Sequence, residues 1–118
     1  MIQSILHLYK AFTNSWRGLK NAWRFQWAFR VEVVLFLIAL PGAFYLGKNA
    51  MEYILLLSSV FLLLIMELIN SAIETTVNRI GLEYHELSGL AKDLASSAIL
   101  LAILNMFMTW GIILFHQV

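Results

Sequence analysis

The chain has 118 residues, of which 61% are hydrophobic and only 13% are charged. A soluble domain is about half apolar and about a quarter charged, so this composition excludes an ordinary soluble globule and indicates a small polytopic membrane protein. The absence of Cys excludes a disulfide framework, thiolate chemistry and zinc sites built on sulfur. The length permits one domain, which we expect to cover residues 1–118.

The first predicted element is an amphipathic helix over about residues 2–27. Its apolar residues step by three and four and form one stripe: Ile2, Ile5, Tyr9, Phe12, Trp16, Leu19 and Trp23. Lys10, Arg17 and Arg24, spaced seven apart, form a basic row elsewhere on the helix. A basic helix rich in Trp is typical of a segment in the membrane interface. Its charged stretch is too long for a signal peptide, and it has too few Ser for a mitochondrial transit peptide.

Three apolar runs then predict transmembrane helices over about residues 31–46, 53–73 and 94–115. Such a helix needs roughly 20 apolar residues. The first run is the shortest; it begins beside Glu32 and contains Pro41, which we expect to kink or loosen its outer end. No alternation typical of barrel strands is present. The predicted fold is therefore an all-α membrane protein with three transmembrane helices and one interfacial helix.

The basic residues predict the orientation of these spans. With the N-terminus in the cytoplasm, seven of the eight Lys and Arg residues lie inside and only Lys48 lies outside. The positive-inside rule therefore puts the N-terminus and the loop around residues 74–93 in the cytoplasm, and the C-terminus outside.

Several common catalytic motifs are missing from the chain. It has no P-loop, no G-x-G-x-x-G dinucleotide fingerprint and no G-x-S-x-G nucleophile elbow. His7, His85 and His116 are far apart in sequence, which argues against a classical zinc site. No nucleic-acid partner is predicted.

Polar residues inside the second apolar run are the main candidates for function. Glu67 lies within this run, where an ionised carboxylate is costly and by default marks a functional site. The spacing of Glu67, Asn70, Ser71 and Glu74 puts them on one face of a helix. At 1.5 Å per residue the two carboxylates are about 10 Å apart along the axis, with Glu67 in the bundle and Glu74 at the cytoplasmic surface. The alternative is a polar seam that holds helices together.

A second group of polar residues follows in the cytoplasmic segment, with Glu83, Glu86, Lys92 and Asp93. Carboxylates suit Mg²⁺, which typically takes one or two of them plus substrate phosphates, and Lys92 would supply a point charge for phosphoryl oxygens. The alternative is a solvated loop, which we favour for Glu86. In the third run, Ala91, Ala95, Ala98 and Ala102 form a stripe of small residues that predicts a close helix–helix contact.

These residues resemble the prokaryotic integral-membrane diacylglycerol kinases. Residues 67–74 read ELINSAIE, 79–81 read RIG, 83–89 read EYHELSG and 91–93 read AKD. The similarity extends to Ser15-Trp16, Gly18-Leu19, Ala22-Trp23, Ala28-Phe29-Arg30, Glu32 and Thr109-Trp110. It covers nearly the whole chain in order, and the first and third of these runs together are highly specific.

The resemblance implies a homotrimer in the bacterial inner membrane that transfers the γ-phosphoryl group of Mg·ATP to the hydroxyl of diacylglycerol. Glu67 would be the catalytic base and Glu74 the ligand of the Mg²⁺ that accompanies ATP. The remaining nucleotide contacts implied are Asn70, Glu83, Tyr84, His85, Lys92 and Asp93. The implied contacts with the lipid substrate are Trp23, Arg30, Glu32, Ser96 and Trp110.

The chain also departs from the family pattern. Gln26 stands where the family usually has a second metal-binding Glu, and a neutral amide oxygen attracts Mg²⁺ less strongly. Asn78 and Leu90 replace a common Asp and a common Arg, and His7 and Asn14 stand where a basic residue and an aromatic are frequent. Two alternatives stay open: an undecaprenol kinase of the same family, and a non-enzymatic small membrane transporter or accessory protein.

Overall fold

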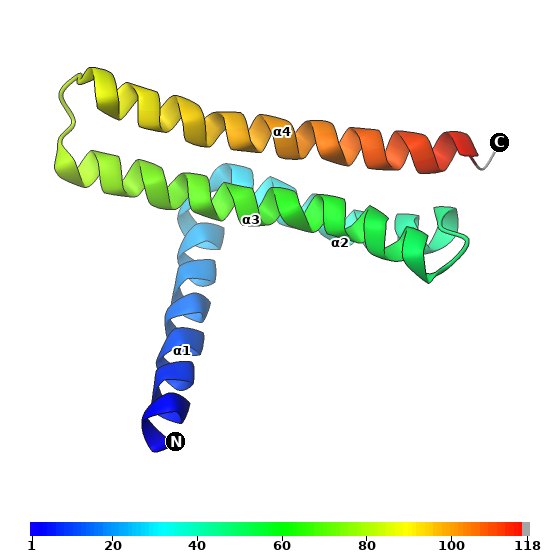
Figure 1. The fold of residues 1–118 in the computed structure, drawn as a ribbon, viewed down its shortest axis with the longest axis horizontal. Helices are drawn as coiled ribbons and strands as arrows, with labels where there is room; N and C mark the ends of the chain where they lie inside the picture. Colours follow the sequence, from blue (N-terminus) through cyan, green and yellow to red (C-terminus); the bar gives the residue numbers. More distant parts are fainter. Residues whose placement is uncertain (117–118) are drawn as a thin grey trace.

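The computed structural model, which describes residues 1–116, contains four helices: α1 (Ile2–Phe25), α2 (Trp27–Leu46), α3 (Ala50–Ile80) and α4 (Glu86–His116). Helices α2, α3 and α4 run alongside one another, whereas α1 projects crosswise from them (Figure 1). Helix α1 leaves part-way along α3, so that the end of α3 and the start of α4 extend beyond its level (Figure 1). This arrangement separates a crosswise helix from a bundle of three long helices.

The three predicted transmembrane helices are confirmed as candidate spans. Helices α2, α3 and α4 are each long and apolar enough to cross a membrane, and only 17%, 39% and 11% of their most apolar windows are buried in the single chain. Such apolar surface would be unfavourable in water and is expected of helices covered by lipid or by other subunits. Helix α3 is the most buried because it lies between the other two.

The predicted first helix is two residues too long. Gln26 adopts an extended conformation (φ −108°, ψ 103°), and this single residue separates α1 from α2. The chain turns at this residue, and Trp27 begins the first span instead of ending the surface helix. The corner is packed by Ala22, Phe29 and Leu64, one residue from each of α1, α2 and α3.

The segment of residues 74–93 is mostly helical, contrary to its prediction as a loop. Only residues 81–85 lie outside α3 and α4. The predicted bounds followed the apolar runs, whose length matches the roughly 20 residues that cross the hydrocarbon. The helices themselves continue beyond the ends of these runs. The extra turns carry Glu74, Arg79 and Lys92 away from the hydrophobic part of the bundle.

Helix α2 also continues through Pro41 to Leu46. The Pro41 ring removes one backbone N–H donor from the helix. Only about one turn of helix follows Pro41, and the expected loosening does not end α2 at this residue. The following turn requires Gly47, because a Cβ there would meet the Ala43 carbonyl oxygen at 2.9 Å and the Tyr53 ring. Helix α3 then starts with Asn49, whose side chain accepts a hydrogen bond from the Glu52 N–H at 2.9 Å.

The stripe of small residues packs as predicted. Ala95 and Ala102 are buried and Ala91 and Ala98 are half-buried, because α4 lies along α3 and small side chains allow the two backbones to approach closely. At the end away from α1, Ala43, Leu56 and Ile113 form a second buried cluster joining all three spans. Packing at both ends fixes the positions of the helices around α3.

Candidate functional site

The polar face of α3 runs from the interior of the bundle to its surface. Glu67 and Asn70 are 7% and 8% exposed, whereas Glu74, two turns after Glu67, is exposed to solvent. The Asn70 amide donates a hydrogen bond of 3.3 Å to a Glu74 carboxylate oxygen. The structure therefore has the expected arrangement, in which Glu67 is the buried carboxylate and Glu74 is the surface carboxylate.

Glu32 on α2 adds a second carboxyl group to the buried end of this face. Its side chain lies within hydrogen-bonding range of that of Glu67. Within residues 1–116, the Glu32 Oε2 atom and the Asn70 Oδ1 atom are buried and have no hydrogen-bond partner. Buried acceptors are normally satisfied, so these two oxygens mark a polar interior that the single chain leaves incomplete.

An open cavity of about 870 Å³ lies between α1 and α3. On the α1 side it is lined by Arg17 and by amide side chains that include Gln26, and on the α3 side by Ser71, Thr75 and Thr76. Thr75 is the neighbour of Glu74 in sequence, so the cavity reaches the turn of α3 that carries this carboxylate. Its size suits a ligand as large as a nucleotide, and its lining offers several polar side chains among apolar surface.

Lys92 is held in place across the α3–α4 junction. Its ammonium group donates a hydrogen bond of 2.9 Å to the side-chain oxygen of Asn78. Because Asn78 is neutral, this bond orients the ammonium group without cancelling its charge, and the charge stays available for an anion. The bond joins the last turn of α3 to the second turn of α4 and gives Asn78 a role that the sequence did not reveal.

The other predicted nucleotide contacts are more open. Tyr84 is 90% exposed, and Glu83, His85 and Asp93 are also exposed. The His85 Nδ1 atom accepts a hydrogen bond of 3.1 Å from the Leu87 N–H and so caps the start of α4. This bond uses one ring nitrogen and leaves Nε2 for another partner.

Among residues 1–116, no three His, Asp or Glu side chains are grouped closely enough to hold a metal ion by themselves. Mg²⁺ commonly takes only one or two protein carboxylates and completes its coordination with waters and substrate phosphates. The exposed Glu74 carboxylate is the hard oxygen donor that suits it. The donor set therefore fits a magnesium ion that arrives with phosphate.

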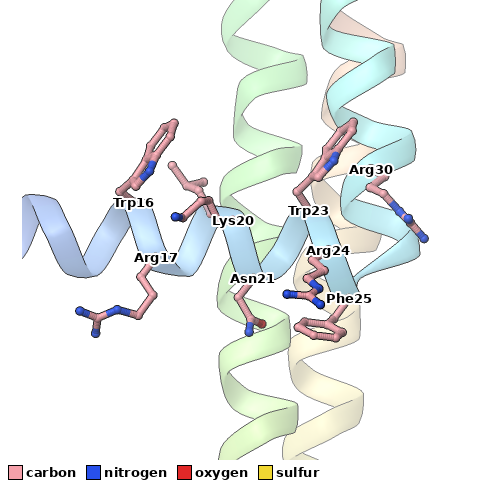
Figure 2. Close-up of a pocket in the computed structure, with 9 residues that line it drawn as sticks. Trp16, Arg17, Lys20, Asn21, Trp23, Arg24, Phe25 and Arg30 are labelled. Carbon is pink, nitrogen blue, oxygen red and sulfur yellow. The ribbon is translucent and has the colours of Figure 1, made fainter.

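The residues predicted to contact the lipid lie in separate places. Trp23 and Arg30 line a cavity at the corner between α1 and α2, and Trp23 points to the side of α1 from which α2 rises (Figure 2). Glu32 is beside Glu67, and Ser96 is exposed on α4. The chain by itself does not gather these residues around one point.

Trp110 lies at the opposite end of the bundle from this corner. Its indole N–H donates to the Leu56 carbonyl oxygen and to the Ser59 hydroxyl, both at 3.1 Å. Leu56 precedes Glu67 by about 16 Å of helix at 1.5 Å per residue. The structure thus gives Trp110 a clear role in joining α3 to α4 and does not bring it to Glu67. The buried Ser59 was missed, because a single Ser in an apolar run gives no signal of its partner.

Trp110→Phe is expected to destabilise the protein by about 0.5–1.5 kcal/mol, because the single indole N–H, shared between two acceptors, contributes about one hydrogen bond, while an aromatic ring remains. The measurement is thermal unfolding in detergent micelles. Phe115→Leu, which alters an exposed aromatic residue on the same helix, is the matched control and should leave the midpoint nearly unchanged. A variant that keeps its midpoint but loses kcat would instead indicate contact between Trp110 and the lipid substrate.

An apolar cavity of about 320 Å³ lies between the outer halves of α2 and α4. It extends from Leu35, one turn after Glu32, to Trp110, and is lined along α4 by Met106 and Phe107. Its depth in the span and its apolar lining suit a hydrocarbon chain.

The chain is similar to proteins of one family over most of its length. The family model for prokaryotic diacylglycerol kinase matches residues 13–114. A diacylglycerol kinase of Escherichia coli (strain K12) is 50% identical over 108 residues, covering 92% of this chain and 88% of that protein. A diacylglycerol kinase of Haemophilus influenzae is 46% identical over 111 residues, covering 94% of each chain. One of Helicobacter pylori (strain J99) is 44% identical over 104 residues, covering 88% and 81%. The resemblance in the sequence is confirmed, and the chain belongs to the prokaryotic diacylglycerol kinase family.

Proposed function

We infer that the chain transfers the γ-phosphoryl group of ATP to the hydroxyl of 1,2-diacylglycerol, giving phosphatidic acid. The observation that carries the inference is its similarity to diacylglycerol kinases over 92% of its length. The buried carboxyl group of Glu67 supports it, since a lipid hydroxyl must lose its proton at membrane depth. The chain needs no P-loop for this chemistry, because phosphoryl transfer depends mainly on positioning and charge stabilisation.

In the proposed mechanism Glu67 is the general base. The lipid hydroxyl oxygen attacks the γ-phosphorus and forms a new O–P bond while the bond to the bridging oxygen of ADP breaks. The hydroxyl proton passes to Glu67, and ADP leaves with the electron pair. The unpartnered oxygen of Glu32 would orient the hydroxyl group before it reacts.

The nucleotide would bind at the cytoplasmic end of the same helix face. Magnesium, when bound, would neutralise charge on the phosphates, and Glu74 would be its carboxylate ligand. Lys92, held by Asn78, would contact phosphoryl oxygens. The further proposed nucleotide contacts are Asn70, Glu83, Tyr84, His85 and Asp93. The cavity between α1 and α3 would provide the space for the nucleotide.

Gln26→Glu is expected to lower the Mg²⁺ concentration that gives half-maximal activity, since a carboxylate attracts the cation more strongly than an amide. Gln26 lines the cavity that reaches the turn of Glu74. The measurement is a Mg²⁺ titration of kinase activity at fixed ATP, with Asn21→Asp as the control because Asn21 lines the same cavity. An unchanged titration, or an equal change in the control, would contradict a metal-binding role for position 26.

The lipid substrate would approach from the membrane side. Trp23, Arg30 and Ser96 are the proposed contacts near the cytoplasmic surface, and Glu32 is the contact next to the reacting hydroxyl. One acyl chain would lie in the apolar cavity between α2 and α4, which starts one turn beyond Glu32. Trp110 lines the far end of that cavity and would contact the chain end there.

The proposed setting is the bacterial inner membrane, with the N-terminus in the cytoplasm and the C-terminus outside. The seven basic residues on the cytoplasmic side support this orientation. Helix α1 would lie in the cytoplasmic interface, since its apolar stripe is exposed in the chain. A homotrimer would cover part of the apolar surface of the spans and bring further residues to each site.

The test is transfer of ³²P from Mg·ATP by the purified protein in mixed micelles that contain either diacylglycerol or undecaprenol. Label in phosphatidic acid that disappears in Glu67→Gln is the expected result. Label only in undecaprenyl phosphate would keep the mechanism and change the substrate. No label in either lipid, from folded protein with saturating Mg²⁺, would favour a transporter or accessory protein.

A further inference from the structure

The corner between α1 and α2 gathers positive charge around an open cavity. Residues 1–31 contain five Lys and Arg residues and no Asp or Glu. Four of these cations line one cavity of about 770 Å³: Arg17, Lys20 and Arg24 from α1 and Arg30 from α2. We call the three cations of α1 and their cavity the basic corner, since Arg30 is proposed above to contact the lipid substrate.

No carboxylate compensates this charge in the part of the chain that the structure describes. The residues that line the basic corner include no Asp or Glu. The Arg24 guanidinium instead lies over the Phe25 ring, 5.3 Å from its centroid. This contact restrains the guanidinium group while its N–H donors stay free for an anion.

The basic corner lies at the depth of lipid headgroups. Helix α2 begins at Trp27, directly after the corner, and is the first candidate span. Trp16 and Trp23 point to the side from which α2 rises, whereas Arg17 and Arg24 point to the opposite side of α1 (Figure 2). Trp side chains concentrate at the boundary between hydrocarbon and headgroups, so the cations of the corner lie at the level of the lipid phosphates or just outside it.

We propose that the basic corner binds the headgroup of an anionic phospholipid of the cytoplasmic leaflet and thereby fastens α1 to the membrane surface. Arg binds phosphate oxygens through its planar fork, and clustered Lys and Arg attract anionic lipids. Trp16, which lines the same cavity, would contact the glycerol and upper acyl region of the same lipid. The proposal rests on the interfacial position of α1 proposed above and goes beyond the transfer reaction, because this lipid is not consumed.

The test measures lipid preference by tryptophan quenching. The full-length protein is reconstituted in bilayers of phosphatidylcholine, and brominated phosphatidylglycerol or brominated phosphatidylcholine is titrated in. Brominated phosphatidylglycerol is expected to bind at least threefold more tightly, and 0.5 M NaCl should weaken this preference because the attraction is electrostatic. Equal affinity for the two lipids in low salt would overturn the proposal.

Lys20→Gln combined with Arg24→Gln is the informative variant, since it removes two cations from the corner and leaves Arg30 and Arg17 in place. The preference for phosphatidylglycerol should disappear or fall at least threefold. Lys10→Gln combined with Lys48→Gln removes the same charge from positions outside the cavity and should keep the preference. A preference that persists in the corner variant, or an equal loss in the control, would contradict the assignment.

Two further measurements separate lipid binding at the corner from misfolding and from nucleotide binding. Circular dichroism and gel filtration identify variants that have unfolded. Lys20→Arg keeps the charge of the corner and should therefore keep the preference for phosphatidylglycerol. Addition of ATP without metal should leave the lipid preference unchanged; if ATP abolishes it, the corner belongs to the nucleotide site. Since binding is measured without turnover, a negative result here leaves the proposed kinase activity standing.

Discussion

Glu67→Gln is expected to lower kcat by about 10²–10⁴-fold, the usual contribution of a positioned general base, with little change in the KM for ATP. Gln has nearly the same shape and can keep a hydrogen bond to its neighbours, but it cannot accept the hydroxyl proton. The measurement is steady-state kinetics in mixed micelles at saturating diacylglycerol with ATP varied.

The matched control for this variant is Glu86→Gln, because Glu86 is an exposed carboxylate at the start of α4 that we place outside the site. It should retain kcat within about twofold, as expected of surface substitutions. A Glu67→Gln enzyme with kcat within tenfold of the wild type would exclude Glu67 as the base. Glu32 would then be the next candidate, since its side chain is next to that of Glu67.

Glu74→Gln should raise the KM for Mg·ATP by roughly tenfold to a hundredfold, the scale of affinity lost when the surroundings of a metal ion are altered. The carboxylate is exposed and receives a hydrogen bond from Asn70, so the substitution removes charge with little effect on packing. Kinetics at increasing Mg²⁺ are the measurement, and excess Mg²⁺ should restore much of the activity.

Comparison of the two variants tests the division of labour along α3. The buried carboxyl group should affect the chemical step, and the exposed one should affect nucleotide binding. Equal increases in the KM for ATP in both variants would contradict this division. So would a Glu74→Gln enzyme whose activity does not respond to added Mg²⁺.

The structure explains how one helix could serve two substrates in different phases. Glu67 is 7% exposed, whereas Glu74, seven residues further along α3, is exposed. The two side chains share a face because they are seven residues apart, close to two helical turns. A lipid hydroxyl and a soluble nucleotide can thus approach the same face from opposite directions.

Much of the fold could be predicted from the sequence. The positions of the three spans follow from apolar length, because the thickness of hydrocarbon sets the number of residues required. The grouping of Glu67, Asn70 and Glu74 follows from helical periodicity alone. The sequence placed Glu74 on the helix face of Glu67 but did not predict that the helices extend through residues 75–80 and 86–93, because hydropathy marks the end of an apolar run and not the end of a helix.

The candidate site was predicted less completely, because its contacts join residues distant in sequence. The pairing of Glu32 with Glu67 depends on how α2 packs against α3, and Lys92 meets Asn78 only because α4 returns along α3. The hydrogen bonds from the Trp110 indole N–H to Leu56 and Ser59 likewise depend on how α4 packs against α3. A sequence motif shows which residues occur together, but it does not show which residue on another helix each side chain contacts.

The sequence by itself determined the class of the protein, the number of its spans, its family and the identity of the two carboxylates on α3. These properties depend on local composition, periodicity and motif spacing, which the order of residues contains in full. Only the tertiary structure decided that Glu32 joins the buried end of that face, that Asn78 holds Lys92 and that four cations surround one cavity at the α1–α2 corner. Each of these depends on packing between helices and on the turn at Gln26, where a single extended residue sets the direction of the whole of α1.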